Sequence, residues 1–294
     1  MSPMPLVLSQ SPPTPLKSAV RSLMFMTGRH WARPSLVGRG TVQDLYYWVC
    51  DGRIDTNVLL NNFYSVFFPT IDTATSGTLL IHDPQGRPIG TTTVPVGHLQ
   101  CVKLTLSHLL RDWRRPGEPA PECGNLLVTL AIPNAVLETL SEVRGPFYFW
   151  HRFYIEYVTA ASQPAFTHCV DKTWILRHGQ PRAVPWYRRP QVRDWAPEMP
   201  LNIDEYRRVW VILMNRTPRP VRLTLTIEDT QDRARHFPAT ISSRAVHRFE
   251  LSRETLDGLA PRALRMRVSG MPTTWARPVL FKEFENGTIS AMHC

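Results

Sequence analysis

The chain carries the same β-rich pattern twice, and this repeat constrains the fold more than any single motif does. Residues 79–107 read LLIHDPQGRPIGTTTVPVGHLQCVKLTLS, and residues 225–252 read LTIEDTQDRARHFPATISSRAVHRFELS. The aligned pairs are Asp83 with Asp229, Gln85 with Gln231, Arg87 with Arg233 and, after a gap of one residue, Ser107 with Ser252. Because an internal repeat is one structural unit used again, the sequence predicts two similar domains that can pack on each other.

Each copy also closes on a similar short motif. The first copy ends in AFTHC at residues 165–169, and the second ends in SAMHC at residues 290–294. From Ser107 to His168 the chain advances 61 residues, against 41 residues from Ser252 to His293. We therefore expect the first copy to differ from the second mainly by longer loops.

Short segments rich in β-branched and aromatic residues occur in both copies, separated by turn residues. In residues 221–229, VRLTLTIED, apolar and polar side chains alternate, which predicts an antiparallel strand with Val221, Leu223, Leu225 and Ile227 on its buried face. The Pro-Gln-Gly step after Asp83 predicts a hairpin. The expected strands are 44–50, 57–69, 77–83, 87–96, 101–107, 126–132, 147–158, 209–215, 221–229, 234–241, 245–252, 263–270 and 277–284, with one helical turn at 137–143 and a loop at 111–124.

These patterns predict an all-β chain with two tandem antiparallel β-sandwich domains and a basic, Pro-rich N-terminal arm. We expect an extended arm at residues 1–42, the first sandwich at 43–172, a linker rich in Pro, Trp and Arg at 173–204, and the second sandwich at 205–294. The 27 prolines favour loops and short strands over long helices. No run of 18 apolar residues occurs, so the sequence predicts no membrane-spanning helix.

Five cysteines without a CxxC pair indicate reduced thiols rather than a disulfide framework. We therefore expect a cytoplasmic protein, either free or peripheral to a membrane complex. The formal net charge is +10, and the excess is uneven. Residues 1–43 contain no Asp or Glu, so the arm should bind an acidic surface. An Arg-rich genome and a cleaved targeting peptide are the alternative explanations of this segment.

The arm supplies the candidate partner-binding residues. Its basic side chains flank a small apolar cluster, Leu23-Met24-Phe25-Met26, which suits a groove on a partner or a membrane–water boundary. The candidates are Lys17, Arg21, Leu23, Phe25, Arg29, Trp31 and Arg33.

The stretch from Val209 to Phe284 resembles the sensory rhodopsin transducer family of small β-sandwich proteins. The similarity rests on VWVILMN, VRLTLTIEDTQDRAR and ISSRAVHRFELSRETL, with a weaker match in ALRMRVSGMPTTWARPVLFKEF. It covers about a quarter of the chain, and most of it if the first copy is counted. These motifs are core patterns of a sandwich, so the resemblance implies a partner-binding module and transfers no functional residue.

The sharpest candidates for chemistry are the two His-Cys ends, His168-Cys169 and His293-Cys294. Imidazole and thiolate are good zinc or copper ligands. However, neighbouring residues on a strand point to opposite faces, so one adjacent pair rarely supplies two ligands. We expect no tightly bound metal and no cofactor.

Other patterns allow further alternatives. A cysteine nucleophile lacks an accompanying catalytic motif, so we expect no enzyme activity. The linker interleaves Trp174, Trp186, Tyr187 and Trp195 with arginines, which suits single-stranded nucleic acid or sugar but also suits packing on its own domains. Two N-glycosylation patterns, at Asn215 and Asn286, are explained as well by turn chemistry.

The sequence as a whole predicts a non-catalytic protein-binding or scaffolding subunit of a larger assembly, which could lie at a membrane. We expect protein partners with an acidic face, or a membrane surface, rather than nucleic acid. The alternative is a β-sandwich module that binds a carbohydrate or another small ligand.

Overall fold

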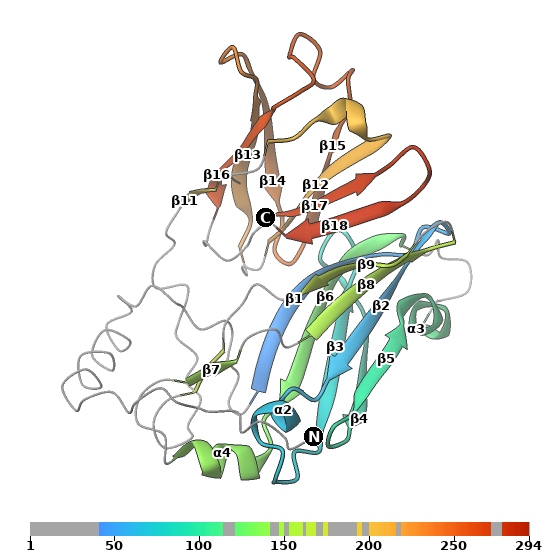
Figure 1. The fold of residues 1–294 in the computed structure, drawn as a ribbon, viewed down its shortest axis with the longest axis vertical. Helices are drawn as coiled ribbons and strands as arrows, with labels where there is room; N and C mark the ends of the chain where they lie inside the picture. Colours follow the sequence, from blue (N-terminus) through green and yellow to red (C-terminus); the bar gives the residue numbers. More distant parts are fainter. Residues whose placement is uncertain are drawn as a thin grey trace, which may run out of the picture.

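The computed structural model describes residues 41–113, 121–141, 147–149, 153–160, 163–168, 173–175, 193–195, 200–215, 219–271 and 278–293. This part of the chain is nearly all β and forms two antiparallel sandwiches in tandem, stacked along the long axis of the molecule (Figure 1). No helix among these residues is long and apolar enough to cross a membrane.

Two four-stranded sheets make the first sandwich. One has the order β1-β6-β3-β4 and the other β5-β2-β8-β9. The strands are β1 (Thr41–Val49), β2 (Ile54–Asn61), β3 (Thr75–His82), β4 (Pro88–Val96), β5 (Cys101–Thr105), β6 (Cys123–Ala131), β8 (Phe153–Thr159) and β9 (Ala165–His168). Its helices are α2 (Tyr64–Phe67), α3 (Leu106–Trp113) and α4 (Asn134–Ser141).

The second sandwich repeats this plan with orders β11-β16-β13-β14 and β15-β12-β17-β18. Its strands are β11 (Arg193–Trp195), β12 (Arg208–Met214), β13 (Val221–Glu228), β14 (Ala234–Ile241), β15 (Val246–Leu251), β16 (Arg265–Met271), β17 (Val279–Glu283) and β18 (Ile289–His293). A short 3-10 helix, η2 (Ile203–Glu205), precedes β12, and β7 (Phe147–Phe149) pairs with β10 (Thr173–Ile175) outside both sandwiches.

The two sandwiches have the same strand order in both sheets, as the internal repeat predicts. Asp83 and Asp229 begin the same hairpin turn, because the backbone N–H of each donates to the carbonyl oxygen of Arg87 or Arg233, at 2.9 Å in both copies. The one-residue gap in the alignment is a β-bulge, because Ile81 pairs with Gly90 while His82 pairs with Pro88. The end motifs align as well, since His168 lies opposite Tyr154 and His293 lies opposite Val279.

A buried asparagine also recurs. Asn62 and Asn215 follow β2 and β12. The backbone N–H of each donates at 2.9 Å to the carbonyl oxygen of the residue before the paired strand, Gln100 before β5 or Ala245 before β15. Their side-chain amides donate to the carbonyl oxygens of Gly97 and Ser242, at 2.9 and 2.8 Å. Each asparagine therefore fixes the equivalent turn, β4–β5 in the first copy and β14–β15 in the second. The Asn at the end of the strand is the sequence feature that specifies this turn.

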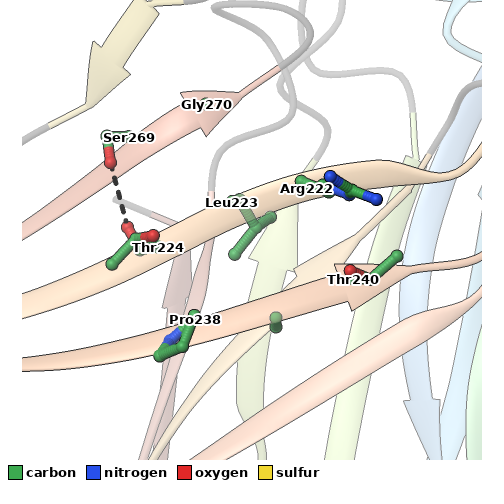
Figure 2. A pocket seen from close by; sticks show the side chains of 8 residues that line it. Arg222, Leu223, Thr224, Pro238, Thr240, Ser269 and Gly270 are labelled. Atoms are coloured by element: carbon green, nitrogen blue, oxygen red, sulfur yellow. Dashed lines mark hydrogen bonds between the residues drawn. The ribbon is translucent and has the colours of Figure 1, made fainter.

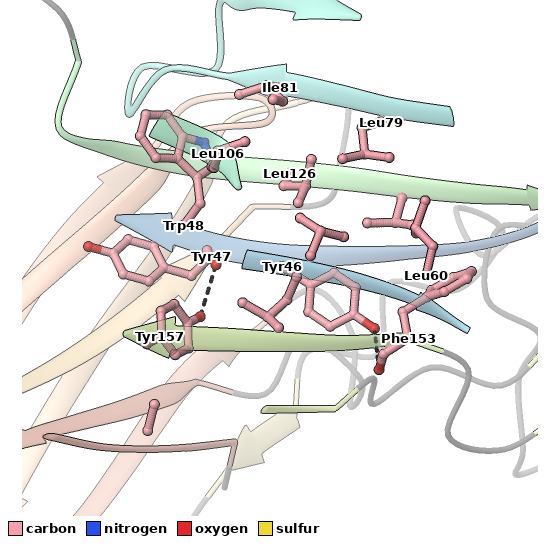
Figure 3. Packing of buried hydrophobic residues seen from close by; sticks show 14 of the residues in the cluster. Tyr46, Tyr47, Trp48, Leu60, Leu79, Ile81, Leu106, Leu126, Phe153 and Tyr157 are labelled. Carbon is pink, nitrogen blue, oxygen red and sulfur yellow. Dashed lines mark hydrogen bonds between the residues drawn. The ribbon is translucent and has the colours of Figure 1, made fainter. Parts of the chain in front are cut away.

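Large aromatic and aliphatic side chains fill the first sandwich (Figure 3). Trp48 is fully buried and its indole N–H donates to the His82 carbonyl at 3.0 Å. The Tyr157 hydroxyl donates to the Tyr47 carbonyl at 2.9 Å, which ties β8 to β1 across the sandwich. In the second sandwich Leu223, Leu225 and Ile227 are buried as the alternation predicts, while Val221 is only partly buried.

Three expectations about local structure are wrong. Residues 63–69 do not continue a strand, because α2 turns there. Residues 106–113 form α3, whose Leu106 and Leu110 are buried one helical turn apart, so the loop expected from 111 begins later. The segment assigned to the linker contributes β11, the edge strand of a second-sandwich sheet. A three-residue strand gives too short a pattern to be recognised in a sequence.

Candidate protein-binding surface

The second sandwich docks on the first through one face of its sheet β15-β12-β17-β18. On this docking face, Phe281 packs edge-on against Tyr157, with ring centroids 4.8 Å apart, and against Tyr47 at 6.2 Å. Further members of the docking face that join the core of the first sandwich are Trp210, Ile212, Val279, Ile289 and Ala291. The opposite face of the same sheet packs in the second core, so this sheet is buried on both sides.

Two turns meet beside this apolar contact. The backbone N–H of Val246 donates to the carbonyl oxygen of Pro84 at 2.9 Å, and the Asn125 amide donates to the carbonyl of Arg244. Gly86 has φ +85°, and a Cβ atom there would overlap the Ser243 carbonyl oxygen and lie 2.8 Å from the Arg244 carbonyl carbon. The turn at 83–87 can therefore approach the second sandwich only because residue 86 is glycine.

An ion pair joins the sandwiches at the edge of the docking face. The guanidinium of Arg53, from the first sandwich, pairs with the buried carboxylate of Glu283. Arg207 of the second sandwich lies 3.6 Å from the same carboxylate. A carboxylate buried between domains is costly unless it is paired, so Arg53 favours the docked arrangement.

The first sandwich carries an equivalent face on its sheet β5-β2-β8-β9, but its chemistry differs. The shared registers place Asn57 at the position of Trp210 and Glu156 at the position of Phe281. Glu156 accepts hydrogen bonds from Asn57 at 2.7 Å and from Lys103 at 2.6 Å. The centre of this equivalent face therefore holds hydrogen-bonded polar side chains, where the docking face has aromatic side chains.

The rim of the equivalent face exposes large apolar side chains. Leu99 is 71% exposed and Phe166 is 51% exposed, and they occupy the positions of Arg244 and Ala291 on the docking face. Val66, 56% exposed, follows Ser65, whose hydroxyl accepts the backbone N–H of Leu99 at 2.8 Å. Val66, Leu99 and Phe166 are the exposed large apolar residues of the described part of the chain, and all three belong to the first sandwich.

Burial raises the pKa of each described thiol. Burial raises the pKa of Cys50, and a hydrogen bond to Asp55 raises it further. Burial also raises the pKa of Cys101 and of Cys123. A catalytic cysteine needs a lowered pKa, so the surroundings of these three thiols oppose activation.

Most residues predicted from sequence as sites lie outside the described part. These are Lys17, Arg21, Leu23, Phe25, Arg29, Trp31 and Arg33 of the arm, and Cys169 and Cys294. His168 and His293 end β9 and β18, two strands that run close together where the sandwiches meet. Within the described ranges, no three His, Cys, Asp or Glu residues cluster as a metal site would require.

Both asparagines of the glycosylation patterns act in turns. Asn215 is buried, and its amide bonds the carbonyls of Arg219, Ile241 and Ser242. Asn286 accepts the backbone N–H of Thr288 at 3.0 Å. Asn215 is thus inaccessible to a glycan in the folded chain.

A shallow pocket of about 420 Å³ lies on the second sandwich, between β13, β14 and β16 (Figure 2). Thr224, Thr240 and Ser269 supply hydroxyl groups, and Arg222 supplies a guanidinium beside them (Figure 2). The Ser269 hydroxyl donates to the Thr224 carbonyl at 3.5 Å. Such a lining offers hydrogen bonds to a small polar or anionic ligand.

Comparison of the chain with known protein families and with curated proteins found no match. The similarity to the sensory rhodopsin transducer family therefore stays a prediction from the sequence. The docking residues escaped prediction because Trp210, Phe281 and Gly86 look like ordinary core and turn residues. One difference in the sequence pointed to the contact: the aligned turns carry glycine at residue 86 but aspartate at residue 232.

Proposed function

We propose that this protein is a non-catalytic protein-binding or scaffolding subunit of a larger assembly. The observation that carries the proposal is the pair of equivalent sheet faces. One copy uses this face to bind a protein surface, namely the first sandwich. The other copy presents the face with Leu99 and Phe166 exposed on it. Large apolar side chains exposed beside polar groups are typical of a protein interaction site.

The mixed character of this face favours a reversible partner. Its centre holds the Lys103–Glu156 pair, and the Lys103 side chain remains 53% exposed. Interfaces of transient complexes are more polar than permanent ones, which bury apolar residues as the docking face does. The acid-free arm would add a second contact to a negatively charged protein or membrane surface.

The experiment is a quantitative comparison of partner recovery from the native host. We expect Leu99→Ser with Phe166→Ser to lose the proteins that co-purify with the full chain, at an unchanged melting temperature. Thr93→Ser, on another sheet of the same sandwich, is the control and should retain them. Equal recovery with the double variant would refute binding through this face.

The pocket beside Arg222 supports a second candidate function, the binding of a small polar ligand. Three hydroxyls and one guanidinium belong to its described lining residues, and no aromatic side chain does. This composition favours an anion or a polar small molecule over a sugar ring that stacks on an aromatic side chain.

A titration followed by backbone amide NMR shifts tests this candidate. Inorganic phosphate and glucose are the probes, and Arg222→Ala is the variant. We expect phosphate to shift the amides of Thr224, Thr240 and Gly270 in the parent chain but not in the variant. Unchanged spectra with both probes would remove this candidate function.

A further inference from the structure

The two sandwiches contact each other through different surfaces, which we call the head and the tail. Because the sandwiches share one fold, each of them has both surfaces. The head is the face of sheet β5-β2-β8-β9 or β15-β12-β17-β18 with the adjoining turn at 97–100 or 242–245. The tail is the end of the sandwich that carries the turn at 83–87 or 229–233, together with the neighbouring residue Asn125 or Arg265. Within one chain, the head of the second sandwich contacts the tail of the first, and its strand β18 also runs beside β9 and β8 of the first sandwich. Among the described residues, the first head still exposes Leu99 and Phe166, and the second tail still exposes Arg265.

We propose, building on the function above, that the partner is a second copy of this chain: its second tail binds the first head. A head-to-tail contact that does not close on itself can repeat between molecules. In this assembly, the second sandwich of one copy would contact the first sandwich of the next copy, and the same contact would repeat along the chain of copies.

The exposed residues of the first head fit this assignment. Leu99 and Phe166 stand at the positions of Arg244 and Ala291, which contact the first sandwich from the second head. The first head therefore exposes apolar side chains at positions whose counterparts in the second head contact the first sandwich.

The remaining tail is basic. Next to the turn at 229–233, Arg265 and Arg267 are exposed on β16, and the registers place Arg265 at the position of Asn125. Asn125 is the tail residue whose amide donates to the Arg244 carbonyl. Arg265 can make the equivalent donation to the Leu99 carbonyl of the next copy, because a guanidinium is also a donor.

The charges of the two sandwiches are complementary. Residues 43–168 hold 11 Asp and Glu against 8 Lys and Arg, whereas residues 205–294 hold 9 against 15. Opposite net charges steer a second tail toward a first head and oppose contacts between two first heads.

One residue limits the strength of the contact. Asp232 stands where Gly86 allows the close approach of the first tail turn, and both adopt φ above +50°. A side chain at this position keeps the second tail turn farther from its partner. We therefore expect reversible association in the micromolar range, weaker than the contact within the chain.

Sedimentation velocity of the full chain at rising protein concentration tests the proposal. We expect the weight-average sedimentation coefficient to rise with concentration, and less so when NaCl is raised from about 0.05 to about 0.5 M, since salt screens the charges. Asp232→Gly should strengthen association. A chain that stays monomeric at all concentrations would overturn self-assembly but leave a different protein partner on the same face open to the recovery experiment above.

Two surface variants distinguish the head-to-tail arrangement from a symmetric dimer. Leu99→Ser with Phe166→Ser removes the head, and Arg265→Glu with Arg267→Glu reverses the tail. Each variant alone should remain monomeric, but their mixture should form 1:1 dimers because one intact tail meets one intact head. Arg253→Glu, exposed elsewhere on the second sandwich, is the charge control and should associate like the parent. A mixture that stays monomeric would refute the arrangement.

Discussion

Gly86 and Asp232 occupy the same left-handed position of the same turn, but only Gly86 faces another domain. The two turns share the Asp–Arg bracket, in which Arg87 Nε lies 2.6 Å from Asp83 and Arg233 Nε lies 2.8 Å from Asp229. The close approach of Ser243 admits no side chain at residue 86, whereas residue 232 is exposed. The Asp–Arg pair therefore belongs to the turn itself, whereas the glycine at residue 86 belongs to the contact between the sandwiches.

Gly86→Ala should therefore destabilise the chain more than the same substitution at another glycine with a left-handed backbone conformation. The conformation alone costs roughly 1–2 kcal/mol. At Gly86 the new methyl group also overlaps the backbone of Ser243 and Arg244. Gly52→Ala is the matched control, because Gly52 has φ +82° with no atom within 4 Å of its Cβ position. Equal free energies of unfolding for the two variants, measured by urea denaturation, would contradict a tight contact at Gly86.

Leu225→Ala tests the packing of the second core. Leu225 is fully buried between Phe237 on β14 and Val268 on β16, so truncation should cost about 2–5 kcal/mol in the free energy of unfolding. Thr240→Ala, exposed on β14, should change it by less than about 0.5 kcal/mol. A small loss at Leu225 would mean that the strand faces solvent or a loose interface.

The repeat predicted the architecture because it depends on local patterns. Alternation in β13 identified its buried face, and Asp83 with Asp229 identified equivalent turns. The docking of the sandwiches was not predictable in this way. Phe281 alternates like any strand residue, and only the three-dimensional register shows that it lies on the side opposite the core of its own sandwich. The exposed positions of Leu99 and Phe166 depend on the same long-range packing.

Phe281→Ala should uncouple the two sandwiches. The side chain is buried among Tyr47, Tyr157 and Trp210, and its removal should cost about 3–5 kcal/mol. We expect calorimetry to resolve two unfolding transitions in the variant. Phe284→Ala is the control, since Phe284 packs edge-on against Tyr206 within the second sandwich. A single transition at nearly the parent temperature would refute the role of Phe281 in coupling.

Deletion of residues 1–40 tests the arm. If the arm binds a partner, the shortened chain should keep its melting temperature and lose proteins that co-purify with the full chain. If the arm instead folds back on residues 44–170, the shortened chain should melt earlier and still associate. The second result, measured by calorimetry and partner recovery together, would refute the arm as a partner-binding segment.

Acid should weaken the second sandwich through Asp229. Burial on its own raises the pKa of this carboxyl, but hydrogen bonds from the Ala260, Gln231 and Arg233 backbones and from the Arg233 side chain outweigh it, so the pKa lies well below its usual value. A carboxyl with a lowered folded-state pKa stabilises the fold above its unfolded pKa of about 3.9. That contribution is lost as the pH falls through the lower folded value.

Asp229→Asn should therefore melt earlier than the parent at pH 7, and the difference between their melting temperatures should shrink as the pH falls below about 4, where the parent carboxylate loses its advantage. Asp232→Asn, an exposed carboxylate in the same turn, is the control and should follow the parent at every pH. Melting curves recorded from neutral pH to about pH 2 give the comparison. A constant difference between Asp229→Asn and the parent would show that the charge of Asp229 does not hold this turn.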